Sequence, residues 1–419
     1  MGVGRQLYNF LLASSQAYAK WDLEVSTSIL KNRKKLLILL ALLLPILAGV
    51  FAEAYEYHEM LGGKAAYAPA FYTTTIFLAS IAVGLAAGLI TGCIGAGGGF
   101  IITPALMAVG VKGILAVGTD LFHIFAKAIM GTTMHKKLGN VSVKLAIAFL
   151  IGSIGGTFIG GAINKSLYNA DPLLSELFIS TIYAVLLGFL GFYALFDFLK
   201  TTRGASTQAK QQTSGGDMTN LASKLQGLSV PPMITFDEDL IPGGRRISSW
   251  IVALGGVVVG LLAAIMGVGG GFVTFPMFVY IFGVSSMTTV GTDILQIIFT
   301  AGFAAIGQYA IYGYVFYTLA IGMLLGSLLG IQVGALTTKA VSGIHIRGFY
   351  AMSIIAGFIN RVTTLPKKLV EMDMISLPMW LVNGIEQVGN VVFWVVVAFF
   401  GFWVCSKFVV NIRKLRGEE

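Results

Sequence analysis

A run of glycines breaks an otherwise apolar stretch at Gly95–Phe100 (Gly-Ala-Gly-Gly-Gly-Phe), and the pattern returns at Gly267–Phe272 (Gly-Val-Gly-Gly-Gly-Phe). A proline follows each run closely, Pro104 in the first case and Pro276 in the second. Consecutive glycines free backbone N–H and C=O groups from helical bonding. Hydrocarbon tolerates this only where the backbone is buried in protein or lines a wet cavity. If the surrounding stretches span a bilayer, the motif predicts two broken membrane helices.

The apolar stretches around the glycines have the composition of membrane segments. Only 11% of the 419 residues are charged and 56% are hydrophobic, whereas soluble domains carry roughly 25% charged residues. Windows of about 20 uncharged residues recur, which is the length that crosses a hydrocarbon core. The alternating ten-residue segments of a membrane β-barrel are not seen. The sequence therefore predicts an all-α polytopic membrane protein with about 10–12 membrane segments.

The two glycine runs belong to a longer duplication. Gly118-Thr119-Asp120 has a counterpart in Gly291-Thr292-Asp293, and Lys165 has one in Lys339. A nearly constant offset predicts two homologous repeats. If the short apolar runs after the glycines are crossings, the repeats start from opposite sides of the membrane. The sequence then predicts inverted repeats, a plan found in many transporters; re-entrant short runs are the alternative.

Basic clusters beside apolar runs place both termini in the cytoplasm, and a Ser-, Gln- and Gly-rich stretch between the repeats predicts a flexible linker. A cleavable signal peptide ending near Ala54 competes with the first membrane helix, and Asp237–Asp239 is expected to be a solvated edge. The predicted parts are a cytoplasmic N-terminal segment (1–35), an extra membrane helix (36–55), transmembrane repeat 1 (71–199), a polar cytoplasmic linker (200–247), transmembrane repeat 2 (248–362), an interfacial stretch (363–384), a last membrane helix (385–407) and a basic cytoplasmic tail (408–419).

The glycine breaks and the helices after them supply the candidate site. A helix that begins at a glycine break offers unpaired N–H groups at its positive dipole end, which suits an anion. Asp120, His123 and Lys127 share one helix face, and Lys127 would attract an anion. Asp120 and Asp293 are candidate proton carriers, with helix capping as the alternative; His123 has a core role as its alternative. The predicted substrate-binding residues are Gly97, Gly98, Gly99, Thr103, Gly269, Gly270, Gly271, Thr274, Thr119, Thr292, His123, Gln296 and Lys127.

Other classes of protein lack support in the sequence. It contains no metal-ligand cluster, catalytic triad or cofactor fingerprint, and membrane topology accounts for the net charge of +9 without a nucleic-acid partner. We therefore expect no enzyme activity, no cofactor and no bound metal. The expected partners are a small anion and membrane lipid, and a homodimer stays open.

The duplicated motif resembles the signature of the TauE/SafE sulfite exporter family of anion permeases, here Gly95–Pro104 and Gly267–Pro276, each followed by a Gly-Thr pair. The resemblance covers residues 71–362. The extra N-terminal span, long linker and C-terminal extension depart from that pattern, as does Asp after Gly-Thr. The resemblance to this family implies a secondary transporter in the inner (plasma) membrane that exports sulfite or an organosulfonate such as sulfoacetate. Alternating access is expected and proton coupling stays open. The alternatives are an anion channel and a transporter of another small anion such as a carboxylate.

Overall fold

The computed structural model describes residues 74–94, 98–137, 142–203, 220–237, 243–337 and 343–411, all within one compact unit, Lys64–Glu419. The predicted N-terminal segment and extra membrane helix lie outside the described residues, as do residues 95–97 of the first break (Gly-Ala-Gly) and the tail beyond Asn411.

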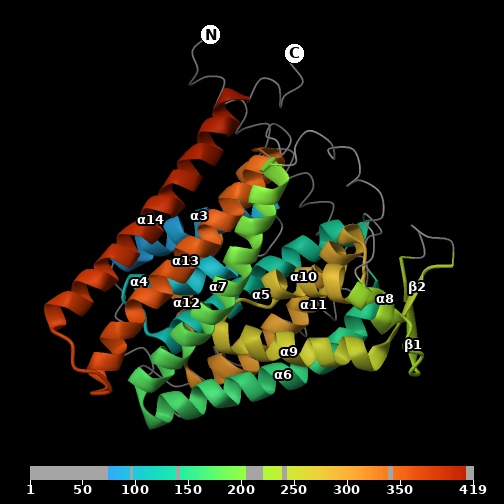
Figure 1. The fold of residues 1–419 in the computed structure, drawn as a ribbon, viewed down its shortest axis with the longest axis horizontal. Helices are drawn as coiled ribbons and strands as arrows, with labels where there is room; N and C mark the ends of the chain where they lie inside the picture. The colour runs from blue at the N-terminus through green and yellow to red at the C-terminus, as the bar shows by residue number, and fades with distance from the viewer. Residues whose placement is uncertain are drawn as a thin grey trace, which may run out of the picture. The chain divides into compact units, whose positions relative to one another are not determined.

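Long helices make up both predicted repeats (Figure 1). The first repeat contains α3 (Thr74–Ile94), α4 (Gly99–Ala108), α5 (Gly113–Lys137), α6 (Val143–Ala170) and α7 (Pro172–Arg203). The second contains α9 (Ser249–Met266), α10 (Gly271–Pro276), η2 (Met277–Phe282), α11 (Ser286–Phe303), η3 (Ala304–Tyr309), η4 (Ala310–Tyr312), α12 (Tyr317–Thr337) and α13 (Gly343–Glu371), and α14 (Met379–Val410) follows.

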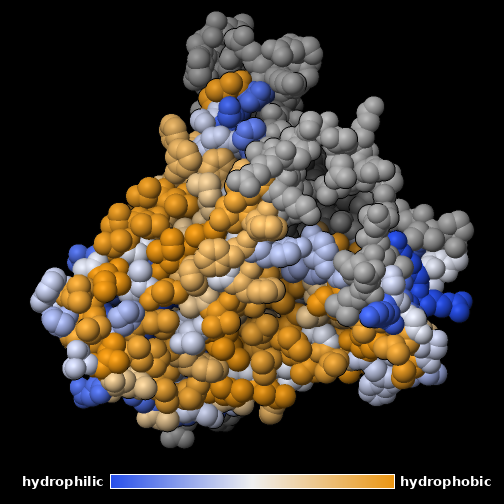
Figure 2. Space-filling model, viewed as in Figure 1, coloured by the Kyte–Doolittle hydropathy of each residue, from blue (hydrophilic) through white to orange (hydrophobic). Residues whose placement is uncertain are grey.

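Several helices have the length and composition to cross a membrane. Among the described residues there are five, namely Val143–Ala170, Pro172–Phe196, Ser249–Met266, Gly291–Tyr312 and Met379–Val410. Shorter apolar helices cover 75–91, 99–108, 271–282 and 317–331. Apolar side chains dominate the face seen in Figure 2, and Phe189 and Phe402 are 72% and 74% exposed. Apolar surface on this scale marks contact with lipid or protein, as expected of a multi-pass membrane protein.

The predicted linker is partly folded, which corrects the expectation of a flexible segment over 200–247. Helix α7 extends to Arg203, α8 covers Asn220–Gln226, and β1 (Met233–Phe236) pairs antiparallel with β2 (Arg245–Ser248). The strands bury Ile234, Phe236 and Ile247 in a cluster with residues of α6 and η2. The Ser- and Gln-rich run that dominates the linker's composition lies outside the described residues. Helix α8 and the two strands are formed by the more apolar residues of the linker.

Asp237 ties this small sheet to the start of α11 and is not the solvated edge that the sequence suggests. It is buried, and it accepts hydrogen bonds from the Ser285 amide (2.9 Å), the Ser285 hydroxyl (2.8 Å) and the Thr288 hydroxyl (2.6 Å). Arg245 donates to the Gly283 carbonyl beside it. The sheet therefore anchors the connection between the second broken helix and α11.

The stretch predicted to be interfacial over 363–384 contains parts of two helices. Helix α13 continues through Pro366 to Glu371, and α14 already begins at Met379. The two lysines that suggested a membrane interface form ion pairs between helices. Lys367 lies 2.8 Å from Glu386 on α14, and Lys368 pairs with Glu176 on α7. These pairs hold the extension of α13 against its neighbours.

Helices α6 and α9 lie side by side (Figure 1), and they pack through glycines. A β-carbon at Gly152 would lie 1.8 Å from the carbonyl oxygen of Ala253, and one at Gly156 would lie 2.1 Å from that of Val257. The contacts advance four residues on each helix, so the helices run parallel. Small residues permit this approach, which membrane helices use in place of a hydrophobic driving force.

Helices α3 and α12 pack in the same way. A β-carbon at Gly326 would lie 2.0 Å from the carbonyl oxygen of Ile81, and one at Gly330 would lie 2.3 Å from that of Leu85. These helices are therefore parallel as well. Each contact pairs the first helix of one repeat with the fourth helix of the other.

Helices α7 and α13, which end the two repeats, run antiparallel to each other. Gly191 of α7 faces Ile355 of α13, whereas Phe198, further along α7, faces Gly348, which is earlier on α13. Matched helices of the two repeats thus lie side by side in opposite directions.

Candidate functional site

The two glycine breaks lie against each other. A β-carbon at Gly99 would be 3.0 Å from the Cα of Val268, and the rings of Phe100 and Phe272 are 5.8 Å apart. Gly97 lies outside the described residues. The chain folds this way locally because glycines adopt left-handed backbone conformations without steric cost. Gly98 has φ +67° and Gly270 has φ +90°.

The meeting point of the breaks is closed in this conformation. Gly98–Phe100 and Gly267–Phe272 are buried, and Ile124 of α5 fills the space between them. A β-carbon at Gly99 would lie 2.9 Å from Ile124 Cδ1, and one at Gly269 would lie 2.7 Å from Ile124 Cγ2. A solute can reach the glycine amides only after Ile124 moves away.

Three side chains that the sequence did not single out hold the last turn of α9 before the second break. Tyr309 donates to the carbonyl oxygen of Ala264 (2.5 Å), and Tyr183 donates to that of Met266 (2.5 Å). Asn164 donates to the carbonyl oxygen of the residue between them (3.0 Å). The final carbonyls of a helix have no partner within it, so these bonds stabilise the break. The available signal was an Asn shortly after the glycine-rich run of α6.

The polar face predicted on α5 meets three other helices. The hydroxyl of Thr103 on α4 donates to Asp120 Oδ2 (3.0 Å), and His123 Nε2 lies 3.0 Å from Ser327 Oγ on α12. Lys127 Nζ donates to the hydroxyl of Thr91 on α3 (3.4 Å). The structure therefore brings Thr103, Asp120 and His123 together, with contacts from both repeats.

The matching face of α11 forms a continuous chain of hydrogen bonds. Gln296 donates from Nε2 to Asp293 Oδ1 (2.8 Å), and Thr300 donates to Gln296 Oε1 (2.7 Å). The hydroxyl of Ser153 on α6 lies 2.7 Å from that of Thr300. Asp293 borders the second break, because a β-carbon at Gly271 would lie 3.3 Å from Asp293 Oδ2. The face thus joins the second break to the first repeat.

The predicted threonines have backbone partners. Thr119 accepts from the amide of Phe316 (2.9 Å), and Thr292 accepts from the amide of Ser142 (3.0 Å). Each bond reaches from the Gly-Thr-Asp motif of one repeat into the other. Thr274 donates to the carbonyl of Gly270 within its own short helix (3.0 Å).

Lys165 and Arg361 are further cations among the described helices. Lys165 sits over the ring of Tyr312, with its Nζ 3.3 Å from the ring centroid, and its counterpart Lys339 lies outside the described residues. Arg361 on α13 is buried and donates to the carbonyl of Pro104 (3.3 Å) and to Met107 Sδ (3.2 Å). The sequence of α13 gave no indication of this contact with α4.

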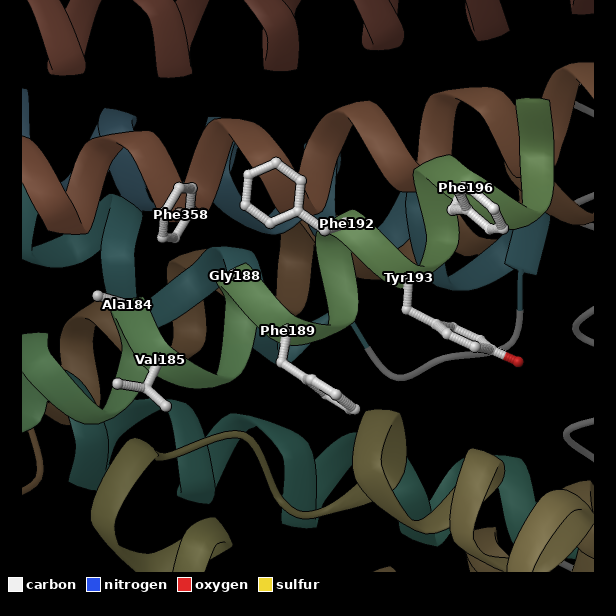
Figure 3. Close-up of a pocket in the computed structure, with 8 residues that line it drawn as sticks. All are labelled: Ala184, Val185, Gly188, Phe189, Phe192, Tyr193, Phe196 and Phe358. Carbon is white, nitrogen blue, oxygen red and sulfur yellow. The ribbon is translucent and has the colours of Figure 1, made fainter. Parts of the chain in front are cut away.

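A groove on the outer face of α7 does not resemble an anion site. Figure 3 shows its lining, which includes Val185, Phe189 and Phe192 from α7 and Phe358 from α13. The lining carries no charged group, so an anion would lose its hydration there without compensation. The exposed aromatic side chains suit lipid instead. Among the residues that the structure describes, no group of three or more metal-ligating side chains occurs.

Comparison with known proteins gives a consistent family. The model for "Sulfite exporter TauE/SafE" matches residues 80–360. The probable membrane transporter protein YjnA of Bacillus subtilis (strain 168) is 24% identical over 61% of this chain and 87% of its own length. The probable membrane transporter protein YunE of the same organism is 26% identical over 62% of this chain and 87% of its own. No solved structure matches the chain. With the matched region covering both glycine breaks and the helices after them, this chain belongs to the TauE/SafE sulfite exporter family of membrane transporters.

Proposed function

We propose that this protein is a secondary transporter that exports a small sulfur-containing anion, sulfite or an organosulfonate such as sulfoacetate, across the inner membrane. The family's name supports the substrate class. The anion would bind where the breaks meet and pass by alternating access. The specific substrate and its direction of movement are parts of this proposal.

The observation that carries the proposal is the contact between Gly99 of the first break and Val268 of the second. The first-turn amides of α4 and α10 lie here. The amides of Ile101 and Val273 donate to the carbonyls of Gly98 and Gly270, and the first amides of a helix precede its internal hydrogen bonds. Two positive dipole ends directed at one place favour an anion. Broken helices that meet at the repeat interface are a typical substrate site in transporters.

We also propose that the repeats are inverted. The antiparallel packing of α7 against α13 supports this, because an operation that matches these helices must reverse their direction. The reciprocal pairs α3–α12 and α6–α9 support a two-fold relation between the repeats. On this proposal, the chain returns across the membrane through the broken segments. Movement around the shared site then follows the usual plan of such transporters.

Buried acidic groups near the breaks favour coupling to protons. Asp120 and Asp293 are both buried, and Asp293 borders Gly271. Like charges in a low-dielectric interior repel strongly. An anion therefore enters more easily when a carboxylate has taken up a proton. We propose that these residues are the candidate proton carriers.

Uptake into proteoliposomes tests the proposal directly. Labelled sulfite and sulfoacetate should enter vesicles containing the purified protein, and an imposed pH gradient should drive accumulation above the external concentration. A channel would only equilibrate the two sides. Unlabelled carboxylates such as acetate are tested as competitors. If neither labelled anion moves under any gradient, the proposed substrate class is wrong.

Lys127→Ala should raise the concentration of anion required for half-maximal uptake by about tenfold or more, because a charge-assisted hydrogen bond contributes roughly 1.5–3 kcal/mol. Lys165→Ala is the matched control, because that lysine stacks on Tyr312 rather than facing the breaks. The measurement is the concentration dependence of uptake at fixed pH. Equal losses of affinity in the two variants would place the cationic group elsewhere.

A further inference from the structure

Two buried atoms on the polar face of α5 lack a hydrogen-bond partner. They are Asp120 Oδ1 and His123 Nδ1, and neither has one among the described residues. The two atoms face each other across 3.8 Å. Buried polar atoms are nearly always paired, so each exception needs an explanation.

The partner of the other ring nitrogen indicates where the imidazole proton lies. Ser327 Oγ is 3.2 Å from the carbonyl oxygen of Leu324, to which it donates, and His123 Nε2 is 3.0 Å from the same hydroxyl. Since the hydroxyl proton is directed to the carbonyl, Nε2 is the donor to Ser327. In a neutral imidazole Nδ1 is then an acceptor. Two acceptors therefore face each other, which is unfavourable unless a proton lies between them.

Few charged or titratable groups influence this pair from the surrounding helices. Lys127, on α5 itself, is close enough to interact electrostatically with both Asp120 and His123. Tyr183 of α7 also interacts electrostatically with Asp120. The α4 and α12 contacts, Thr103 and Ser327, are neutral hydroxyls. Within the described residues, no second carboxyl group contributes to the electrostatics of Asp120 and His123.

At the matching position, the second repeat has a different hydrogen-bond arrangement. Gln296 replaces the histidine and donates an amide N–H directly to Asp293 Oδ1 at 2.8 Å. Its carbonyl oxygen accepts from Thr300. Both ends of the amide are therefore satisfied, and Asp293 Oδ1 has a donor that does not depend on a titratable partner. Of the two matched pairs among the described residues, the one in the first repeat joins two titratable side chains, and the one in the second repeat joins an aspartate to an amide.

We propose that Asp120 Oδ1 and His123 Nδ1 bind one exchangeable proton between them, and that this pair, rather than Asp293, is the proton carrier of the transporter. The assignment rests on the proposed function, because it names the group that couples anion movement to protons.

The step requires only proton transfer. The carboxylate and the neutral imidazole take up one proton from water on the side to which the site is open. This forms an O–H or N–H bond and changes the charge of the pair from −1 to 0. An anion can then occupy the adjacent breaks with less repulsion. Release of the proton on the other side restores the negative charge and favours departure of the anion.

Infrared difference spectroscopy with isotope-labelled histidine tests proton binding without any substrate. In the wild-type protein, the bands of the His123 imidazole and the Asp120 carboxyl should change together as pH varies, because coupled groups titrate as a unit. In Asp120→Asn the His123 midpoint should shift by about one pH unit or more. The control His345→Gln removes an exposed histidine of α13 and should leave the coupled change intact. A His123 signal that is constant over the pH range, or that keeps its midpoint in Asp120→Asn, would overturn the assignment.

Transport provides the second measurement. His123→Gln gives the first repeat the amide that the second repeat has in Gln296, so the variant should carry about one proton fewer per anion than wild type. The number of protons carried per anion is obtained from the pH gradient at which a known anion gradient produces no net flux. An unchanged number contradicts the assignment. If His123→Gln does not fold, Asp120→Asn is measured in its place. If the wild type moves no anion, the proposed function fails, while the spectroscopic titration still decides whether the pair binds a proton.

Discussion

Gly152→Ala should strongly destabilise the protein, whereas Gly155→Ala in the same helix should leave its stability nearly unchanged. A β-carbon at Gly152 would lie 1.8 Å from the backbone oxygen of Ala253, while one at Gly155 has no atom within 4 Å. The clash is with backbone, so a side-chain rotation does not relieve it, and α6 and α9 must separate. Overpacking a tight contact costs roughly 1–3 kcal/mol, and we expect about 3 kcal/mol here.

Thermal unfolding of the purified variants in detergent, followed by size-exclusion chromatography, measures this difference. The two substitutions add the same methyl group and gain the same helix propensity, so the comparison isolates the contact with α9. Gly326→Ala on α12 tests the equivalent contact, since its β-carbon would lie 2.0 Å from the oxygen of Ile81. Similar melting of Gly152→Ala and Gly155→Ala would show that the helices do not pack this closely in the membrane.

Gly270→Ala should reduce anion flux by about tenfold or more. The backbone there has φ +90°, and a β-carbon would lie 2.7 Å from Val259 Cγ1. An alanine in the left-handed region costs roughly 1–2 kcal/mol, and 1.4 kcal/mol corresponds to a factor of about ten. Relief of this strain would turn the backbone at the start of α10, so that its amides no longer point to the meeting place of the breaks.

Gly110→Ala is the matched control for this effect. Gly110 has φ +92°, nearly the same backbone conformation, but no atom lies within 4 Å of its β-carbon position, and it follows the end of α4. Both variants place an alanine at a positive φ close to +90°. Initial uptake rates are compared per mole of folded protein in the vesicles. Equal rates would remove the second glycine break from the transport pathway.

The parts of the structure that follow from local sequence were predictable. The duplicated glycines and prolines indicated the broken helices, and the spacing of Asp120, His123 and Lys127 indicated one face of α5. Helical periodicity determines which residues share a face. Periodicity does not indicate which distant residue meets that face, so the contact of His123 with Ser327 could not be predicted from the sequence.

Other errors came from composition averaged over a segment. The small sheet was hidden because its strands are only four residues long and lie in a polar region. Proline and two lysines suggested that α13 ends near Val362, but Lys367 and Lys368 find acidic partners on neighbouring helices. Proline has its greatest cost in a helix interior, and tertiary contacts overrode that preference here.

The exchange of helices between the repeats determines which parts of the protein can move as units. The glycine contacts bring the backbones of α3 and α12 together, and they do the same for α6 and α9. Separating either pair would break these close backbone contacts, so we expect each pair to move as one body. If the protein works by alternating access, the surfaces that slide would then divide each predicted repeat internally and would not follow the boundary between the repeats.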